Sequence, residues 1–245
     1  MTDYQKFDFG DYKTITENFQ SVISKISNEI ETFQKTISKV FDGFLEIPNS
    51  VKVLAEYGWY LPFDFHPQAV NKLVSEIEED GTKNVDLVMI AYLDNEIKNI
   101  ESDIIKKFPK RKAAIQAAIR AHKNKEYYLS IPVFFSQTEG ICRELTGKRF
   151  FKVKQKPATI AWVSNFKSNS LMAYLLEPLK YAGPARMRQD PKKPKGINRH
   201  DVLHGDCFDY GKDSTNSYKA FSLLNYISDT VFEAKDYLEK NKNNA

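Results

Sequence analysis

Apolar residues recur every three or four positions along most of this chain, which is the spacing of one face of an α-helix. The longest such run spans residues 12–44 and forms a narrow apolar stripe between polar side chains. It predicts a long amphipathic helix that packs either on the chain's own domain or against a second copy of the chain. We expect Pro48 to end this helix. The stripe consists of Ile15, Phe19, Val22, Ile23, Ile26, Ile30, Phe33, Ile37, Val40 and Phe41.

Helical spacing continues beyond Pro48 in shorter runs that glycine, proline and polar residues separate. The sequence therefore predicts an all-α protein, with an N-terminal helical arm over residues 1–48 and one helical bundle over residues 49–245. Residues 148–163 show no clear period, and we expect a loop or a small hairpin there. The expected helices of the bundle cover residues 67–80, 85–108, 109–123, 127–146, 166–179 and 218–232.

The run over residues 127–146 is the most apolar and has apolar residues on several faces, which predicts a central, buried helix. Glu139 and Arg143 lie four positions apart within it and can form an ion pair, or this face of the helix meets the functional site. In the preceding run, His122 lies near the expected C-terminal end, where a partly protonated imidazole interacts favourably with the helix dipole.

Composition narrows the functional classes. Apolar residues make up 42% of the chain and charged residues 28%, which is ordinary for a soluble domain with a hydrophobic core. The net charge of +4 is compatible with a polyanionic partner but does not require one. No run reaches the roughly 20 apolar residues that span a bilayer, so we expect no membrane association and a cytoplasmic location. Cys142 and Cys207 are predicted to be free thiols.

The segment from Asn198 to Gly205 concentrates the residues that carry chemistry. It contains Arg199, His200, Asp201 and His204, and glycine and proline break up the basic loop that precedes it. Histidine can act as a general acid or base near neutral pH, and the planar guanidinium of arginine binds phosphate oxygens in pairs. These are the groups that cleavage of RNA by its own 2′-hydroxyl needs. The cations of the loop, which could contact phosphates, are Arg186, Arg188, Lys192, Lys193 and Lys195.

Arg199, His200 and His204 are arranged as Arg-His-x3-His, which resembles the R-x4-6-H signature of the HEPN superfamily. The resemblance implies an all-helical domain, and many members are metal-independent ribonucleases of bacterial defence and toxin systems. It implies that Arg199 and His204 are catalytic, that His200 fills the polar position after the arginine, and that Asn198 orients a phosphate or the histidine. It also implies a homodimer with two motifs across one cleft, RNA as substrate, and an antitoxin or sensor protein as a possible partner.

Two further side chains are assigned to this site as expectations. Glu139 would support it if the central helix reaches the motif, and Tyr210 could stack on an RNA base. No cofactor and no metal ion are expected. His200 and His204 do have the four-residue spacing of metal ligands on a helix, but no glutamate or third ligand accompanies them.

Two other interpretations stay open at this point. Arg199 and His204 could simply tie the loop to the bundle. The chain could also be a non-catalytic, HEPN-like module that binds a nucleotide or a partner protein, because a fold does not determine a function.

Overall fold

The structure is a computed structural model that describes residues 21, 24–32, 45–168, 170–188 and 196–243. The chain divides into two units, Met1–Leu45 and Glu46–Ala245. In the first unit residues 24–32 are helical, and Ile26 and Ile30 of the apolar stripe are exposed. Most of the helix expected over residues 12–44 lies outside the described residues.

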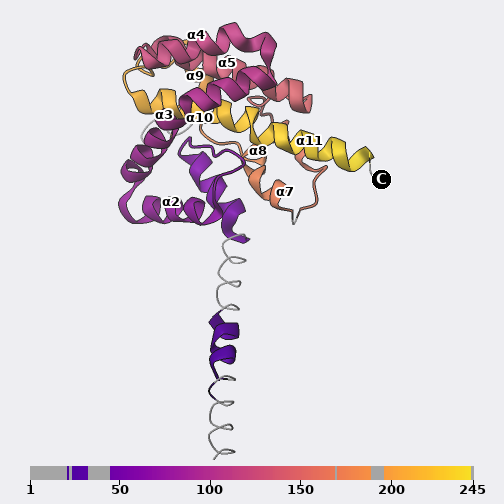
Figure 1. Cartoon of the computed structure of the whole chain (residues 1–245). Coiled ribbons are helices and arrows are strands. Elements are labelled where there is room, and N and C mark those ends of the chain that lie inside the picture. The colour runs from indigo at the N-terminus through magenta and orange to yellow at the C-terminus, as the bar shows by residue number, and fades with distance from the viewer. Residues whose placement is uncertain (1–20, 22–23, 33–44, 169, 189–195, 244–245) are drawn as a thin grey trace, which may run out of the picture. The chain divides into compact units, whose positions relative to one another are not determined.

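The second unit is all-α, as predicted (Figure 1). Its described residues contain no strand, only one isolated antiparallel bridge between Val153 and Pro157. Residues 46–56 at the start of the unit are helical. The elements that follow are α2 (Pro67–Asp80), α3 (Thr82–Lys107), the 3-10 turn η1 (Pro109–Arg111), α4 (Lys112–Lys123), α5 (Tyr127–Thr146), α6 (Ile160–Val163), α7 (Leu171–Leu175), α8 (Glu177–Lys180), α9 (Arg199–His204), α10 (Ser214–Ser228) and α11 (Thr230–Asn243).

Two glycines end helices at the expected positions. Gly147 follows α5 in the left-handed conformation, and its N–H donates to the carbonyl of Arg143. Gly81 ends α2 with a φ of 75° and an N–H bond to Ile77. Pro48, in contrast, does not end a helix, because residues 45–47 and 49–56 on its two sides are helical. The buried side chains of this segment, including Ile47, Val51 and Leu54, hold the helix in place despite the missing N–H.

Two helices that the sequence predicted as continuous are each broken once. The run over residues 166–179 becomes helical only at Leu171, where Ser170 caps α7, since residues 166–168 and 170 are not helical. It then divides into α7 and α8, because Pro178 lacks an N–H and its ring excludes a preceding helical turn. The run over residues 218–232 is divided between α10 and α11 at Asp229. The carboxylate of Asp229 accepts the Phe63 N–H at 2.9 Å and Lys107 Nζ at 2.9 Å, so this break depends on distant segments.

The most buried helix is α10 rather than α5. Every residue from Lys219 to Ser228 is buried, whereas α5 keeps an exposed face with Leu129 and Arg143. The burial of α10 was not apparent from the sequence pattern, because several of its buried residues are serines. Ser222 and Ser228 donate their hydroxyls to carbonyls three residues back, which satisfies them inside the core. The helix α5 packs between α4 and α10.

His122 of α4 lies in the core, contrary to the expectation of a partly protonated imidazole that interacts with the helix dipole. Its Nδ1 is 2.8 Å from Ser217 Oγ, and its ring meets Tyr218 in a T-shaped contact with the centroids 4.5 Å apart. Burial lowers the pKa of His122 to about 4, so its ring is neutral at pH 7. Burial of the imidazole ring, rather than the helix dipole, therefore determines the charge of His122.

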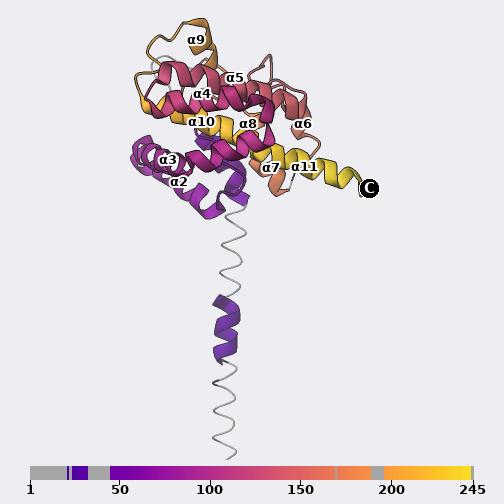
Figure 2. The ribbon, with the colours of Figure 1, turned by 45° about the horizontal axis from the view of Figure 1, so that its top comes forward.

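The region that had no clear period is a loop followed by one helical turn. Residues 148–157 form the loop that contains the bridge, and α6 forms a helical turn that neither the expected loop nor the expected hairpin included. This loop lies close to α9, since Arg199 Cζ is 5.6 Å from the centre of the Phe151 ring. The helix α9 packs against α5 at the edge of the bundle (Figure 2).

Candidate functional site

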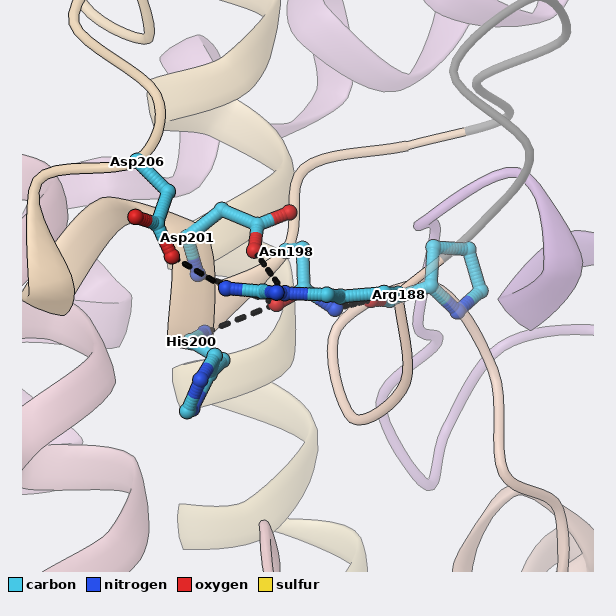
Figure 3. A network of polar contacts seen from close by, with 6 residues as sticks. Arg188, Asn198, His200, Asp201 and Asp206 are labelled. Atoms are coloured by element: carbon cyan, nitrogen blue, oxygen red, sulfur yellow. Dashed lines mark hydrogen bonds and ion pairs between the residues drawn. The ribbon is translucent and has the colours of Figure 1, made fainter.

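The motif forms the short helix α9, which Asn198 and Gly205 delimit. Asn198 caps the helix: its Oδ1 accepts the N–H groups of His200 at 2.8 Å and Asp201 at 3.2 Å. Its Nδ2 donates to the carbonyl of Pro184 at 2.6 Å, and the side chain is buried (Figure 3). Gly205 ends the helix with a φ of 80°. Asn198 therefore joins α9 to the loop before it.

Arg188 fastens the other end of α9. Its Nε donates to Asp201 Oδ1 at 2.6 Å, and its Nη2 bonds the carboxylate of Asp206 (Figure 3). Asp201 lies within α9 and Asp206 just after it, so one guanidinium spans the end of the helix. The positive charge of Arg188 is thereby offset by two carboxylates. Arg188 is 58% exposed, as expected for a loop residue.

Two histidines and one arginine of the motif are arranged on different faces of α9. The rings of His200 and His204 meet at a tilt of 48° with their centroids 4.2 Å apart, because residues four apart share a helix face. Arg199 and His204 are five residues apart, which turns them about 140° from each other around the axis. Both histidines are exposed and Arg199 is half-buried. Within one chain, His200 therefore lies between the two residues that the signature pairs.

A pocket of about 300 Å³ lies beside Arg199. We call it the arginine pocket, and none of the described residues that line it carries a carboxylate. Arg199 itself has no carboxylate partner among the described residues, and its Cζ is 5.6 Å from the centre of the Phe151 ring. The pocket is thus a concave, positively charged site that suits an anion. Its lining residues are Phe151, Val153, Ala185, Arg186, Arg188, Arg199 and His200.

Arg186 contributes to this pocket from the core rather than from an exposed rim. The side chain is only 7% exposed, and its guanidinium lies 3.7 Å from the centre of the Phe150 ring. Nη1 donates to Thr159 Oγ1 and to the carbonyl of Leu179, whereas Nε and Nη2 have no hydrogen-bond partner. Burial lowers the pKa of Arg186, although arginine starts from so high a value that it stays charged. It is a fixed positive charge beneath the pocket.

Glu139 reaches the site through the backbone of the loop. Its Oε2 accepts the N–H of Phe151 at 3.1 Å, so α5 holds the residue that forms one wall of the arginine pocket. The expected ion pair between Glu139 and Arg143 does not form among the described residues, and Arg143 is exposed. Glu139 is therefore a residue that positions the pocket wall.

Tyr210 lies against the start of α5 instead of standing free. Its hydroxyl donates to the carbonyl of Tyr128 at 3.0 Å, and the two rings meet with centroids 5.1 Å apart. Pro132 explains this bond, because it has no N–H to give to the carbonyl four residues earlier. Gly211 allows the close approach: a Cβ there would lie 2.6 Å from the Tyr128 ring. Lys192, Lys193 and Lys195, also expected to contact RNA, lie outside the described residues.

The sequence did not indicate Phe151 and Val153 as site residues, since they lie in the stretch without a clear period. The only hint was the pair Phe150-Phe151, in which one ring is buried and the other lines the pocket. Among the described residues, no three His, Cys, Asp or Glu side chains are grouped so that they could hold a metal ion. The described helices include none that is long and apolar enough to cross a membrane.

Comparisons with models of protein families, with curated proteins and with solved structures found no match to this chain.

Proposed function

We propose that this chain is a metal-independent endoribonuclease of the HEPN type that cleaves single-stranded RNA at α9. The observation that carries the proposal is the arginine pocket, where Arg199 has no carboxylate partner among the described residues and lies beside His200. The His204 ring contacts that of His200 in a tilted arrangement with the centroids 4.2 Å apart, so a second imidazole lies one ring away from the pocket. A guanidinium that can bind a phosphate thus lies next to imidazoles that can transfer protons.

The reaction uses the substrate's own nucleophile. The 2′-oxygen attacks phosphorus while its proton passes to a base, and the bond from phosphorus to the 5′-oxygen breaks as that oxygen receives a proton. The products are a 2′,3′-cyclic phosphate and a 5′-hydroxyl. Arg199 stabilises the charge on the phosphoryl oxygens through its paired donors. His204 is the proton-transfer group, and His200, which lines the pocket, orients it.

A second copy of the chain completes this site in the proposal. Arg199 and His204 lie on different faces of α9, so a homodimer that brings two motifs together would place the histidine of one beside the arginine of the other. The setting we propose is phage defence or a toxin system, in which an antitoxin or sensor protein restrains the enzyme. Toxicity on expression that disappears in His204→Ala would agree with this role.

The test is incubation of labelled single-stranded RNA with the purified full chain in EDTA. We expect cleavage with a 2′,3′-cyclic phosphate end, and a loss of about 10²–10⁴-fold in rate for His204→Ala. Arg199→Lys should also be poor, because an ammonium keeps the charge but not the planar fork. His200→Ala should be less affected than His204→Ala. The matched control is His66→Ala, an exposed histidine before α2, which should cut as fast as wild type.

Cleavage that requires added divalent metal, or equal rates for His204→Ala and wild type, would contradict the proposal. One observation favours a second candidate, a non-catalytic module that binds a nucleotide or a partner. Within one chain, His204 is not among the described residues that line the arginine pocket. RNA or nucleotide that is bound but left intact by every protein of the series would support that candidate instead.

A further inference from the structure

The arginine pocket has two chemically different walls. Phe151 and Val153, from the loop over residues 148–157, supply an apolar wall. Arg199 and His200 of α9 supply a polar wall, and Arg188 closes one side. A volume of about 300 Å³ is at the lower end of the range of small-molecule sites, which combine apolar surface with a few placed polar groups.

The two neighbouring phenylalanines differ in what covers their rings. Phe150 is fully buried, and the Arg186 guanidinium occupies its face at 3.7 Å. Phe151 is half-buried and lines the pocket, and Arg199 Cζ lies over its ring at the longer distance of 5.6 Å from the ring centre. A guanidinium therefore covers the Phe151 ring less closely than the Phe150 ring.

Phe151 is nevertheless held firmly. Its ring is nearly perpendicular to those of Phe135 and Phe150, with centroid distances of 5.6 Å and 4.9 Å. Its backbone N–H bonds to Glu139 of α5. An aromatic ring fixed in this way beside a cationic wall is arranged in advance for a flat, partly apolar ligand that carries a negative charge.

The charges indicate where the negative group of such a ligand would lie. Asp201 and Asp206 offset the charge of Arg188, so Arg188 adds little attraction of its own. Arg199 and the buried Arg186 have no carboxylate bound to them among the described residues, and Arg199 is the one that a ligand can reach. The anion should therefore bind Arg199, with Arg186 adding a fixed charge from below.

We propose that the arginine pocket is a single-nucleotide subsite, in which the base stacks on Phe151 against Val153 and the phosphate binds Arg199 and His200. This inference rests on the proposed function, since it names the part of the RNA that the pocket recognises. The same chemistry is present in one unpaired nucleotide of an RNA strand and in a free nucleoside monophosphate. Aromatic stacking and arginine are the usual means by which proteins hold unpaired bases.

The experiment is calorimetric titration of the full chain, in EDTA, with adenosine 5′-monophosphate, adenosine and inorganic phosphate as separate probes. We expect the monophosphate to bind more tightly than either of the other two. Phe151→Leu keeps the apolar contacts with Phe135 and Phe150 but removes the stacking face, and should weaken monophosphate binding about tenfold. Its binding of inorganic phosphate should stay within about twofold of wild type, whereas Arg199→Lys should weaken both.

Phe208→Leu is the matched control, because Phe208 is 82% exposed, lies close after α9 in the sequence and is not among the described residues lining the pocket. It should bind all three probes as wild type does. Competition by a non-cleavable, 2′-deoxy hexanucleotide shows whether the natural ligand is a nucleotide of an RNA strand or a free nucleoside monophosphate. A hexanucleotide that binds tighter than the monophosphate identifies the strand as the ligand, and the reverse identifies a free nucleotide.

Equal affinity of the monophosphate and inorganic phosphate for wild type would overturn the subsite, and this comparison needs no variant to fold. Monophosphate affinity unchanged in Phe151→Leu would overturn it too. The outcomes are separable from those of the proposed function. RNA that is cut equally well by wild type and by Phe151→Leu would leave the ribonuclease standing without this subsite. Monophosphate bound through Phe151 with no RNA cleavage would support the subsite and remove the ribonuclease.

Discussion

At the scale of single residues, Arg199 of α9 and Arg188 of the loop before it have different surroundings and so different roles. Arg188 is bonded to Asp201 and Asp206, whereas Arg199 faces Phe151 and the open pocket. The sequence placed both near the motif but could not distinguish them. The two arginines differ because Asp206 contacts one of them and Phe151 the other, and both of these residues lie outside α9. The spacing of residues within the motif does not indicate such contacts.

The motif residues themselves show what a sequence pattern can and cannot predict. Asn198 was expected to orient a phosphate or the histidine, and in the structure its side chain caps α9 and bonds Pro184. A cap is a local feature that the order Asn-Arg-His-Asp could have indicated, since asparagine is common before a first helical turn. The pairing of His200 with His204 follows from their spacing alone.

The buried His122 gives the first prediction, on stability as a function of pH. The folded protein holds the pKa of His122 at about 4, below the value of about 6.5 in an unfolded chain. Between these values the unfolded state binds more protons, so this stabilisation is fully present above about pH 6.5 and is lost as pH falls towards 4. We expect it to amount to at most about 3 kcal/mol.

Urea unfolding of wild type and His122→Phe at pH 7 and pH 4.5 measures this contribution. Phenylalanine keeps an aromatic ring beside Tyr218 and Phe134, and Ser217 keeps Ser130 as a partner at 2.8 Å. Protonation of carboxylates lowers the free energy of unfolding of both proteins alike in acid. The difference between their losses from pH 7 to pH 4.5 therefore measures the contribution of His122. An equal loss of unfolding free energy in the two proteins would show that His122 does not titrate in this range.

At the scale of elements, local signals predicted most helix ends, and tertiary contacts decided the rest. Gly81 and Gly147 end helices because each adopts a positive φ that other residues avoid. The break at Asp229 depends on Phe63 and Lys107, which are more than a hundred residues away in sequence. The periodicity of α10 and α11 alone therefore predicted one helix where the chain forms two.

The second prediction concerns the proline inside α5. Pro132 leaves the carbonyl of Tyr128 without its helical donor, and Tyr210 supplies one. We expect Tyr210→Phe to lower the free energy of unfolding by about 1 kcal/mol in wild type. In a Pro132→Ala background the restored N–H bonds the carbonyl of Tyr128. Tyr210→Phe should then lower the free energy of unfolding by less than it does in wild type.

A double-mutant cycle by chemical denaturation measures this coupling. Tyr218→Phe is the control, since its hydroxyl bonds Asp94 and is independent of Pro132. Its cost should be the same in both backgrounds. Additive effects of Tyr210→Phe and Pro132→Ala would contradict the proposed replacement of one donor by the other.

At the scale of the whole molecule, the sequence predicted the all-α class because helical spacing is repeated in nearly every segment. It did not predict the arginine pocket, which forms where α9, the loop over residues 148–157 and Arg186 meet. Such a site depends on how segments pack, and periodicity carries no information on that. Glu139 is the intermediate case: its presence near the site was expected, and its bond to Phe151 was not.

The last prediction is that the chain is a homodimer at micromolar concentration. The first unit presents Ile26 and Ile30, four residues apart on one face of the helix over residues 24–32, with 50% and 53% of their surface exposed. Apolar side chains repeated in this way are stabilised by a partner helix. Light scattering should give twice the mass of one chain for wild type. Ile26→Ser with Ile30→Ser should shift the protein towards the monomer, and Asn28→Ser, on the same helix between them, should not.

Because the proposed site combines Arg199 of one chain with His204 of the other, the monomeric variant should also lose RNA cleavage while it keeps the phosphate affinity of Arg199. A wild type that scatters as a monomer and still cleaves RNA would contradict the composite site.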